Sequence, residues 1–257
     1  MISFEDRGEG PAVTFLHGFA LDGRMWSAQA RYIESTHRTI VVNLPGFGPG
    51  GAEHSGVHCP AQAVLDILDA RGVQRTHLFG HSLGGAVAVD IALALPDRVL
   101  SLTLVDALLL GRPSGIGAWP SCVALAQQGK YDDARRAWLG DPHFEPARRR
   151  PEVMLALERM AGDYACGHWA GRMSNRWLAA EPTSRLAELF LPTRIVGGEL
   201  DTPAFRAMAV EYAELLPNAR SVTVVGAGHV CNLEAPAAFN EAIFGLVGRS
   251  ERAQKKL

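Results

Sequence analysis

Short apolar runs alternate with longer helix-like stretches along most of the chain. The apolar runs are rich in Val, Ile, Leu and Thr, which is typical of strands that are covered on both faces of a sheet. The alternation of such strands with helices indicates βαβ units, and therefore an α/β fold with a mostly parallel sheet. We expect strands at residues 2–5, 12–16, 39–44, 76–79, 100–105, 193–197 and 221–225.

The helical patterns between these runs carry start and stop signals of their own. Pro60 suits the first turn of a helix at residues 59–71, and Gly72 suits its end. Pro236 likewise suits the start of a helix at residues 235–247. We expect the remaining helices of the core at residues 23–34, 83–95 and 204–215.

The alternation breaks between residues 111 and 185. This stretch has no convincing strand, and an insertion here would lie over the carboxyl ends of the strands, where open α/β sheets bind ligands. We therefore expect a core formed by residues 1–110 and 186–257, and a helical cap at residues 111–185. Within the cap, helical patterns occur at residues 118–128, 132–139, 151–160 and 168–178.

Composition narrows the class of protein. The chain has 257 residues, of which 47% are hydrophobic and 20% charged, and this suits one globular α/β domain with an insertion. A net charge of −2 provides no basic field for nucleic acid. No apolar run approaches the ~20 residues of a membrane span, and the first residues lack the pattern of a signal peptide. We expect a cytoplasmic monomer or small homo-oligomer that binds neither nucleic acid nor a membrane.

The cysteines indicate a reducing compartment. The spacings of Cys59, Cys122, Cys166 and Cys231 match no zinc pattern, so we expect four free thiols. Cys231 lies two residues after His229 and is therefore a candidate nucleophile near a reactive histidine. No activating arrangement is visible around it, and we favour a different nucleophile.

That nucleophile is Ser82, in the run Gly-His-Ser-Leu-Gly at residues 80–84. The run follows a predicted strand and opens a predicted helix, which is the setting of the nucleophile elbow of serine hydrolases. Small residues at both ends of the run let the backbone turn tightly, so that the serine hydroxyl stands clear of the sheet. The alternative is a serine that only caps the helix.

A base and an acid follow Ser82 in the order that this arrangement requires. His229 comes after a strand and a Gly-Ala-Gly turn, and Asp201 comes after the strand at 193–197. The alternatives are a buried structural histidine at 229 and a helix-capping aspartate at 201. Two other carboxylates could replace Asp201: Asp106, which ends the strand at 100–105, and Glu199, which is displaced from the favoured position.

Two further motifs carry a family resemblance. Residues 15–19 read Phe-Leu-His-Gly-Phe and residues 43–48 read Asn-Leu-Pro-Gly-Phe-Gly. With the elbow and His229, they resemble the α/β-hydrolase superfamily over nearly the whole chain. Its capped esterases and lactonases are the most similar branch, including 3-oxoadipate enol-lactonase and the pimeloyl-ester carboxylesterases, with cofactor-free perhydrolases almost as similar. The resemblance implies a doubly wound α/β-hydrolase sheet, although the first edge strand looks reduced or missing and the loop at 48–58 departs from the family pattern.

The resemblance also implies a mechanism. Ser82 would attack an acyl carbon, His229 would shuttle the proton, Asp201 would orient the imidazole, and water would then release the acid. The Leu83 N–H would be one oxyanion donor, and by resemblance the Phe19 N–H would be the second. We expect no cofactor and no metal ion. The alternatives are a perhydrolase or a lyase that uses the same triad, and a ligand sensor of the same fold with slow turnover.

The composition of the predicted cap bears on the substrate, which we expect to be a small ester or lactone. Some of its large side chains would face the ligand and favour an apolar or partly aromatic group. A buried arginine, at 172 or 176, would instead suit an anionic substrate, although we favour the alternative that the arginine clusters at 135–136 and 148–150 are solvated surface. The large cap side chains are Trp119, Trp138, Trp169, Trp177, Met154, Met160 and Met173.

Overall fold

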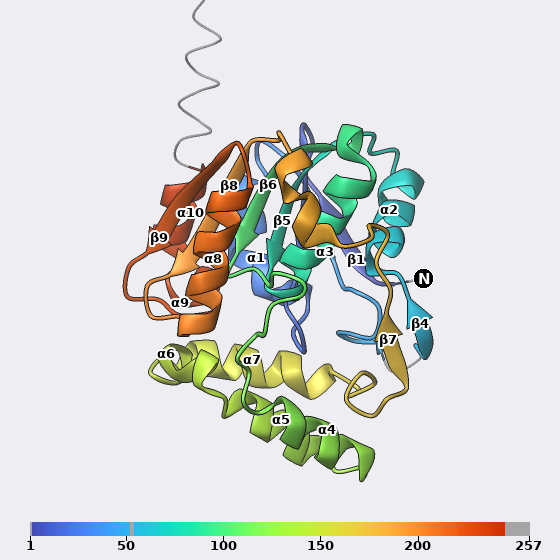
Figure 1. The fold of residues 1–257 in the computed structure, drawn as a ribbon, viewed down its shortest axis with the longest axis vertical. Helices are drawn as coiled ribbons and strands as arrows, with labels where there is room; N and C mark the ends of the chain where they lie inside the picture. Colours follow the sequence, from blue (N-terminus) through green and yellow to red (C-terminus); the bar gives the residue numbers. More distant parts are fainter. Residues whose placement is uncertain (1, 52–53, 245–257) are drawn as a thin grey trace, which may run out of the picture.

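The computed structural model describes residues 2–51 and 54–244, and its centre is a seven-stranded sheet (Figure 1). The strands lie in the order β1-β3-β2-β5-β6-β8-β9. Only β1 is antiparallel to its neighbour, so the predicted mostly parallel sheet is confirmed. The strands are β1 (Phe4–Arg7), β2 (Ala12–Leu16), β3 (Arg38–Val42), β5 (Thr76–His81), β6 (Val99–Val105), β8 (Thr193–Gly198) and β9 (Ala219–Val224).

Each of these seven strands overlaps one of the predicted apolar runs. All five residues of β2 are buried, as the continuous run of apolar positions predicts for a strand covered on both faces. The edge strand β1 alternates between half-buried and exposed positions instead. It is only four residues long and pairs with β3 alone, so the sheet begins at a short antiparallel edge.

Helices cover both faces of the sheet. On one face α1 contacts α10, and on the other α2 packs on α3, which lies against β5 and β6 (Figure 1). Every residue of α3 except the last is buried, and its small side chains let it lie close to the strands. These helices are α1 (Ser27–Ile33), α2 (Pro60–Ala70), α3 (Leu83–Ala94), α8 (Pro203–Leu215) and α10 (Pro236–Phe244).

The predicted core helices are all present, with small differences at their ends. The first begins as a 3₁₀ turn, η1 (Gly23–Trp26), before α1. The last three positions of the helix predicted at 235–247 lie outside the described residues. Short turns that the sequence did not predict are η3 (Pro96–Arg98), η5 (Pro182–Glu188) and the single-turn helix α9 (Cys231–Glu234). Among the described helices, none is both long and apolar enough to cross a membrane.

Residues 111–185, which we call the insertion, form a helical layer at one end of the sheet (Figure 1). Three of its predicted helices are present, at α4, α5 and α7. The layer also contains two short turns that the sequence did not predict. Its elements are α4 (Trp119–Gln127), α5 (Tyr131–Leu139), η4 (Pro142–Phe144), α6 (Glu145–Arg148) and α7 (Pro151–Asp163).

Two predictions for the insertion are wrong: that residues 168–178 form a helix, and that residues 111–185 contain no strand. This segment contains β7 (Met173–Asn175), which pairs in parallel with β4 (Gly56–His58). Gly171 takes a positive φ of 70°, which interrupts a helix. The residues that follow it bond across to the other segment: the Arg172 carbonyl accepts from Gly56 N–H, and the Arg176 N–H donates to the His58 carbonyl. The loop at 48–58 and the end of the insertion are therefore joined by backbone hydrogen bonds.

Candidate active site

Ser82 lies at the sharp turn between β5 and α3. Its backbone has φ 48° and ψ −113°, a conformation that costs a non-glycine residue roughly 1–3 kcal/mol. The surrounding structure holds it there: its N–H donates to the Val105 carbonyl at 3.0 Å, and its own carbonyl accepts from Leu108 N–H at 3.0 Å. Strain of this kind persists where the turn has a function, which fits the predicted elbow.

Close packing at the elbow explains its small residues. A Cβ atom on Gly80 would lie 2.3 Å from the Gly84 carbonyl oxygen. A Cβ atom on Gly84 would lie 2.4 Å from the Leu16 carbonyl oxygen at the end of β2. No side chain fits at either position without moving backbone, so the elbow sequence follows from the approach of α3 to the strands.

His81 connects the elbow to the loop that carries His229. Its Nε2–H donates to the His229 carbonyl at 2.7 Å, and the two rings lie 4.9 Å apart. Burial, together with repulsion from His229, holds the pKa of His81 well below its ordinary value, so this ring is neutral. His81 therefore has a structural role, and it fixes the backbone of one predicted catalytic residue beside the other.

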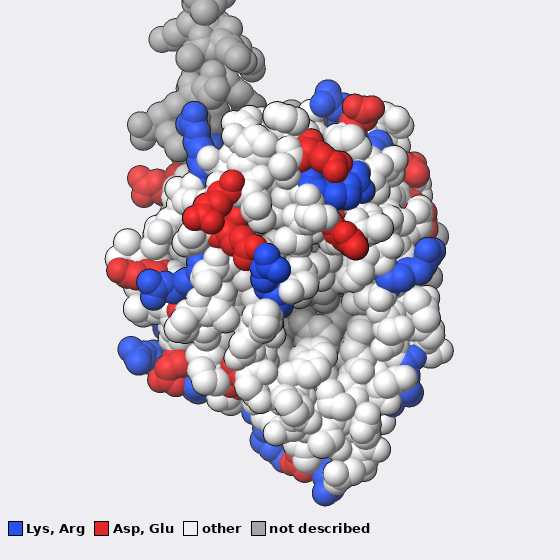
Figure 2. Space-filling model, viewed as in Figure 1, with Lys and Arg blue, Asp and Glu red and all other residues white. Residues whose placement is uncertain are grey.

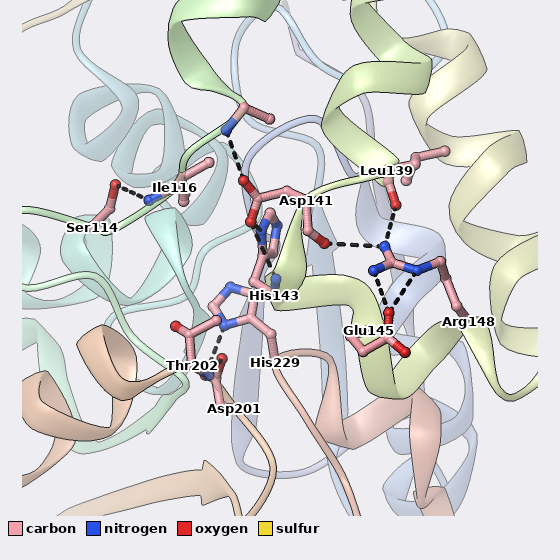
Figure 3. Close-up of polar contacts among 11 residues, drawn as sticks. Ser114, Ile116, Leu139, Asp141, His143, Glu145, Arg148, Asp201, Thr202 and His229 are labelled. Carbon is pink, nitrogen blue, oxygen red and sulfur yellow. Dashed lines mark hydrogen bonds and ion pairs between the residues drawn. The ribbon is translucent and has the colours of Figure 1, made fainter.

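His229 and Asp201 form a buried hydrogen-bonded pair (Figure 3). His229 Nδ1 lies 2.9 Å from Asp201 Oδ2, so the proton on that nitrogen points to the carboxylate and Nε2 is left as the basic atom. Asp201 Oδ1 accepts from the Thr202 N–H at 2.6 Å. The Phe205 ring packs on the imidazole with a centroid distance of 4.1 Å.

The loop before His229 is tied to the insertion. Glu234 accepts from Gly228 N–H at 2.9 Å and from Val230 N–H at 3.3 Å. Arg150 of the insertion pairs with Glu234 at 3.0 Å and donates to the Gly226 carbonyl at 2.6 Å. Because the Glu234 side chain is fully buried, removing Arg150 would leave a buried charge without its partner, so the ion pair couples the loop to the insertion.

The two rival carboxylates lie in different settings. Glu199 is exposed and accepts from the Gly226 N–H at 2.8 Å. Asp106 is buried, takes a positive φ of 42°, and accepts from the Gly198 N–H at 2.8 Å. It therefore lies close to the His229–Asp201 pair, while Asp201 occupies His229 Nδ1.

Asp106, Asp201 and His229 each offer a ligand atom, and these atoms lie within 4.8 Å of one another. By distance alone they could hold a metal ion. His229 Nδ1 and Asp201 Oδ2 already satisfy each other, however, and burial together with the charge of Asp201 raises the pKa of Asp106 well above its ordinary range. The raised pKa disfavours the charged form of Asp106, so these residues are better described as a hydrogen-bonded pair with a neighbouring acid than as a metal-ligand set.

Cys231 is fully buried, and burial followed by repulsion from Asp106 raises the pKa of its thiol well above the ordinary value. A protonated, inaccessible thiol is a poor nucleophile, which agrees with the preference for Ser82. All four cysteines are buried free thiols, as the sequence predicted.

The predicted oxyanion loop runs beside the elbow. A Cβ atom on Gly18 would lie 2.4 Å from His81 Nδ1 and 3.4 Å from Ser82 Cβ, so the loop and the elbow are in contact. His17 holds the loop, since its ring bonds to Gly18 O at 2.7 Å and accepts from Leu44 N–H at 2.9 Å. Burial lowers the pKa of His17 to about 4, so it stays neutral in this structural role.

Phe19 joins this loop to the insertion. Its ring lies in an aromatic cluster, with centroid distances of 4.9 Å to Trp119 and 5.5 Å to both Trp138 and Trp169. Figure 2 shows this face of the molecule hollowed between the core and the insertion, with mainly uncharged residues around the hollow. Arg172 and Arg176 are exposed, so the prediction of a buried arginine at one of these positions is wrong.

The sequence did not single out His143, which the insertion brings against His229. The His143 ring lies 5.1 Å from the His229 ring at an angle of 89° (Figure 3). Asp141 binds it through a short contact of 2.6 Å to Nδ1. The only signal in the sequence was the spacing Asp-Pro-His at 141–143, and nothing local indicates which side of the insertion it faces.

Comparisons with known proteins agree with this geometry. A model of the alpha/beta hydrolase family matches residues 15–242. The chain is 29% identical over 272 residues to a pimeloyl-(acyl-carrier protein) methyl ester esterase of Aeromonas hydrophila, which covers 96% of this chain and 99% of that protein. The solved structure of an N-acyl homoserine lactone degrading enzyme has a TM-score of 0.74 at 27% identity, covering 95% of this chain and 96% of that one. An enol-lactonase from Burkholderia xenovorans, at 21% identity and a TM-score of 0.78, covers 96% of each chain and shares the fold.

Proposed function

The chain belongs to the alpha/beta hydrolase family, and from that premise we propose that it is a serine hydrolase that cleaves a small carboxylic ester or lactone through an acyl-serine intermediate. One observation carries the proposal: His229, in a buried 2.9 Å hydrogen bond with Asp201, is bonded through its own carbonyl to His81, the residue next to the strained Ser82. A histidine held by a carboxylate, next to a serine on such a turn, is the arrangement that activates a hydroxyl.

In the proposed reaction His229 Nε2 takes the Ser82 hydroxyl proton while Oγ attacks the acyl carbon. The oxyanion accepts hydrogen bonds from the Leu83 and Phe19 N–H groups, and the amino end of α3 adds a favourable dipole. His229 then gives its proton to the leaving alcohol, and Asp201 stabilises the charged imidazole in between. Water then attacks the acyl-serine while His229 takes its proton. His229 returns this proton to Ser82 Oγ, and the acid is released.

We propose that the insertion acts as a cap that shapes the substrate pocket. The aromatic cluster around Phe19 supports an apolar or partly aromatic acyl or alcohol group. Two of the relatives support this class, since one is named as a methyl ester esterase and one as a lactone degrading enzyme. A methyl ester and an N-acyl homoserine lactone are therefore the first substrates to assay.

The proposal is tested by combining a covalent label with a mutant. An organophosphonate fluoride should add once to the wild-type chain, and digestion should locate the adduct on the peptide that carries Ser82. The Ser82→Ala variant should take no label and lose at least a thousandfold in ester hydrolysis, with an unchanged far-UV spectrum. A Ser82→Ala variant that keeps its rate, or an adduct on another residue, contradicts the proposal.

A further inference from the structure

His143 enters the site from the insertion and is fixed by Asp141. Asp141 Oδ1 accepts from the His143 ring Nδ1–H at 2.6 Å and from the His143 backbone N–H at 3.2 Å. Its other oxygen accepts from the Ala118 N–H at 2.8 Å, at the start of α4 (Figure 3). The carboxylate is thus held at both oxygens, and the orientation of the imidazole is fixed with it.

The neighbours of this imidazole place it between the two halves of the proposed catalytic machinery. On one side its ring meets His229 at a centroid distance of 5.1 Å. On the other side it meets Trp138 at 4.8 Å, and Trp138 in turn contacts Phe19 at 5.5 Å. A substrate bound at Ser82, between the proposed base and the proposed oxyanion loop, would therefore lie close to His143.

The bond to Asp141 decides which chemistry His143 offers. With the proton on Nδ1, the Nε2 atom has a lone pair and can only accept a hydrogen bond. The hydrogen bonds that His143 makes through its ring Nδ1 and its backbone N–H both go to Asp141. Burial lowers the pKa of His143 to about 4, so the ring stays uncharged at neutral pH. A fixed acceptor of this kind favours a ligand that brings its own donor, because a ligand without one would cover the lone pair and leave it unpaired.

We propose that His143 is a specificity-determining residue whose Nε2 accepts a hydrogen bond from an O–H or N–H group carried by the substrate close to the scissile carbonyl. The inference rests on the proposed function and narrows its substrate class. The preferred esters and lactones carry a hydroxyl or amide N–H one or two carbons from the acyl carbon. Esters with an ether or alkyl group at that place are poorer substrates.

The test compares two matched esters in one assay. Ethyl 2-hydroxyalkanoates and the corresponding 2-methoxy esters differ in the donor, and the 3-substituted pair extends the distance by one carbon. For the better-matched pair, the wild-type kcat/KM should favour the hydroxy ester about tenfold, which is the worth of one hydrogen bond. The ratio should fall to about one in His143→Leu and be partly kept in His143→Gln, whose amide oxygen can accept.

The ratio of kcat/KM for the hydroxy ester to that for the methoxy ester distinguishes a loss of recognition from a change in structure. A shift of His229 caused by either substitution changes both esters alike and cancels in the ratio. Trp138→Phe is the matched control, because it alters the same wall without removing the acceptor and should keep the wild-type ratio. If His143→Leu does not fold, the wild-type ratio and the His143→Gln variant still decide.

A wild-type ratio near one for both pairs, or a ratio that His143→Leu leaves unchanged, overturns the inference. These results are distinct from failure of the proposed function, which would appear as wild-type enzyme inactive on all four esters or as activity that survives Ser82→Ala. An enzyme that hydrolyses these esters through Ser82 without preferring the donor keeps the function and loses the specificity.

Discussion

The molecule contains two buried histidine–carboxylate pairs whose rings are in contact. In the core, His229 Nδ1 lies 2.9 Å from Asp201, and in the insertion, His143 Nδ1 lies 2.6 Å from Asp141. All four side chains are 3% exposed or less. The two pairs use the same atoms, a ring Nδ1 and a carboxylate oxygen, and the contact in the insertion pair is the shorter one.

Their surroundings separate them. The core pair follows β8 and β9, and the His229 carbonyl is bonded to His81, next to the strained Ser82 that we propose as the nucleophile. The insertion pair lies on the 3₁₀ turn η4, and its carboxylate also binds the Ala118 backbone. A carboxylate-bound imidazole is thus no sign of catalysis by itself. The two pairs differ in whether a proposed nucleophile lies nearby, and four predictions test how far this difference extends.

The largest effect is expected from the carboxylate of the core pair. Asp201→Asn should lower kcat for a simple ester by about 10⁴, because an amide N–H facing Nδ1 favours the wrong tautomer and cannot stabilise the imidazolium. Steady-state kinetics on a p-nitrophenyl ester measure it, with urea unfolding as the check on the fold. A loss below tenfold would assign the catalytic acid to another residue.

The carboxylate of the insertion pair should affect stability instead. Asp141→Ala leaves the His143 ring, the His143 backbone and the Ala118 N–H without their acceptor. With two buried donors and one partly buried donor affected, we expect about 4 kcal/mol of lost stability. The kcat on an ester without a donor should fall far less than in Asp201→Asn. Urea unfolding monitored by tryptophan fluorescence gives the free energy, and an unchanged midpoint contradicts the structural role.

The two pairs also show what a single sequence can predict. Ser82, Asp201 and His229 each follow a strand, so that their shared position at one end of the sheet follows from parallel topology. The contact between His229 and Asp201 fits the same reasoning. His143 follows no strand, and its place against His229 depends on how the whole insertion packs. No pattern within a few residues of position 143 contains that information.

The same division holds for the fold. Strands such as β2 and β6 are continuous apolar runs and could be predicted locally. The three-residue ladder between β4 and β7 could not, because its partners are more than 100 residues apart and neither is apolar throughout. The prediction of a buried Arg172 failed for a related reason. Sequence gives its charge, whereas its exposed contacts with Tyr131 OH and the Ala165 carbonyl come from tertiary packing.

The third prediction concerns pH, because the insertion pair should cost stability in acid. His143 has a pKa near 6.5 when unfolded and about 4 when folded, so the unfolded chain binds its proton first as pH falls. The free energy of unfolding should therefore decrease between pH 6.5 and pH 4, by about 3 kcal/mol from this group. His143→Gln should flatten that slope, while His17 and His81 keep contributing to it. Equal slopes in the two proteins would show that His143 titrates normally in the fold.

The smallest effect is expected at the carboxyl group that lies beside the core pair. Burial and the charge of Asp201 raise the pKa of Asp106 well above its ordinary range, so Asp106→Asn keeps the shape of a side chain whose charged form is already disfavoured. One oxygen can still accept from the Gly198 N–H, and kcat should change less than tenfold. The same substitution is thus expected to cause a large loss of kcat at Asp201 and a small change at Asp106. A double-mutant cycle measures the coupling between the two residues. A large loss in Asp106→Asn with little loss in Asp201→Asn would exchange their roles, and His229 would then take its support from the strand end of β6.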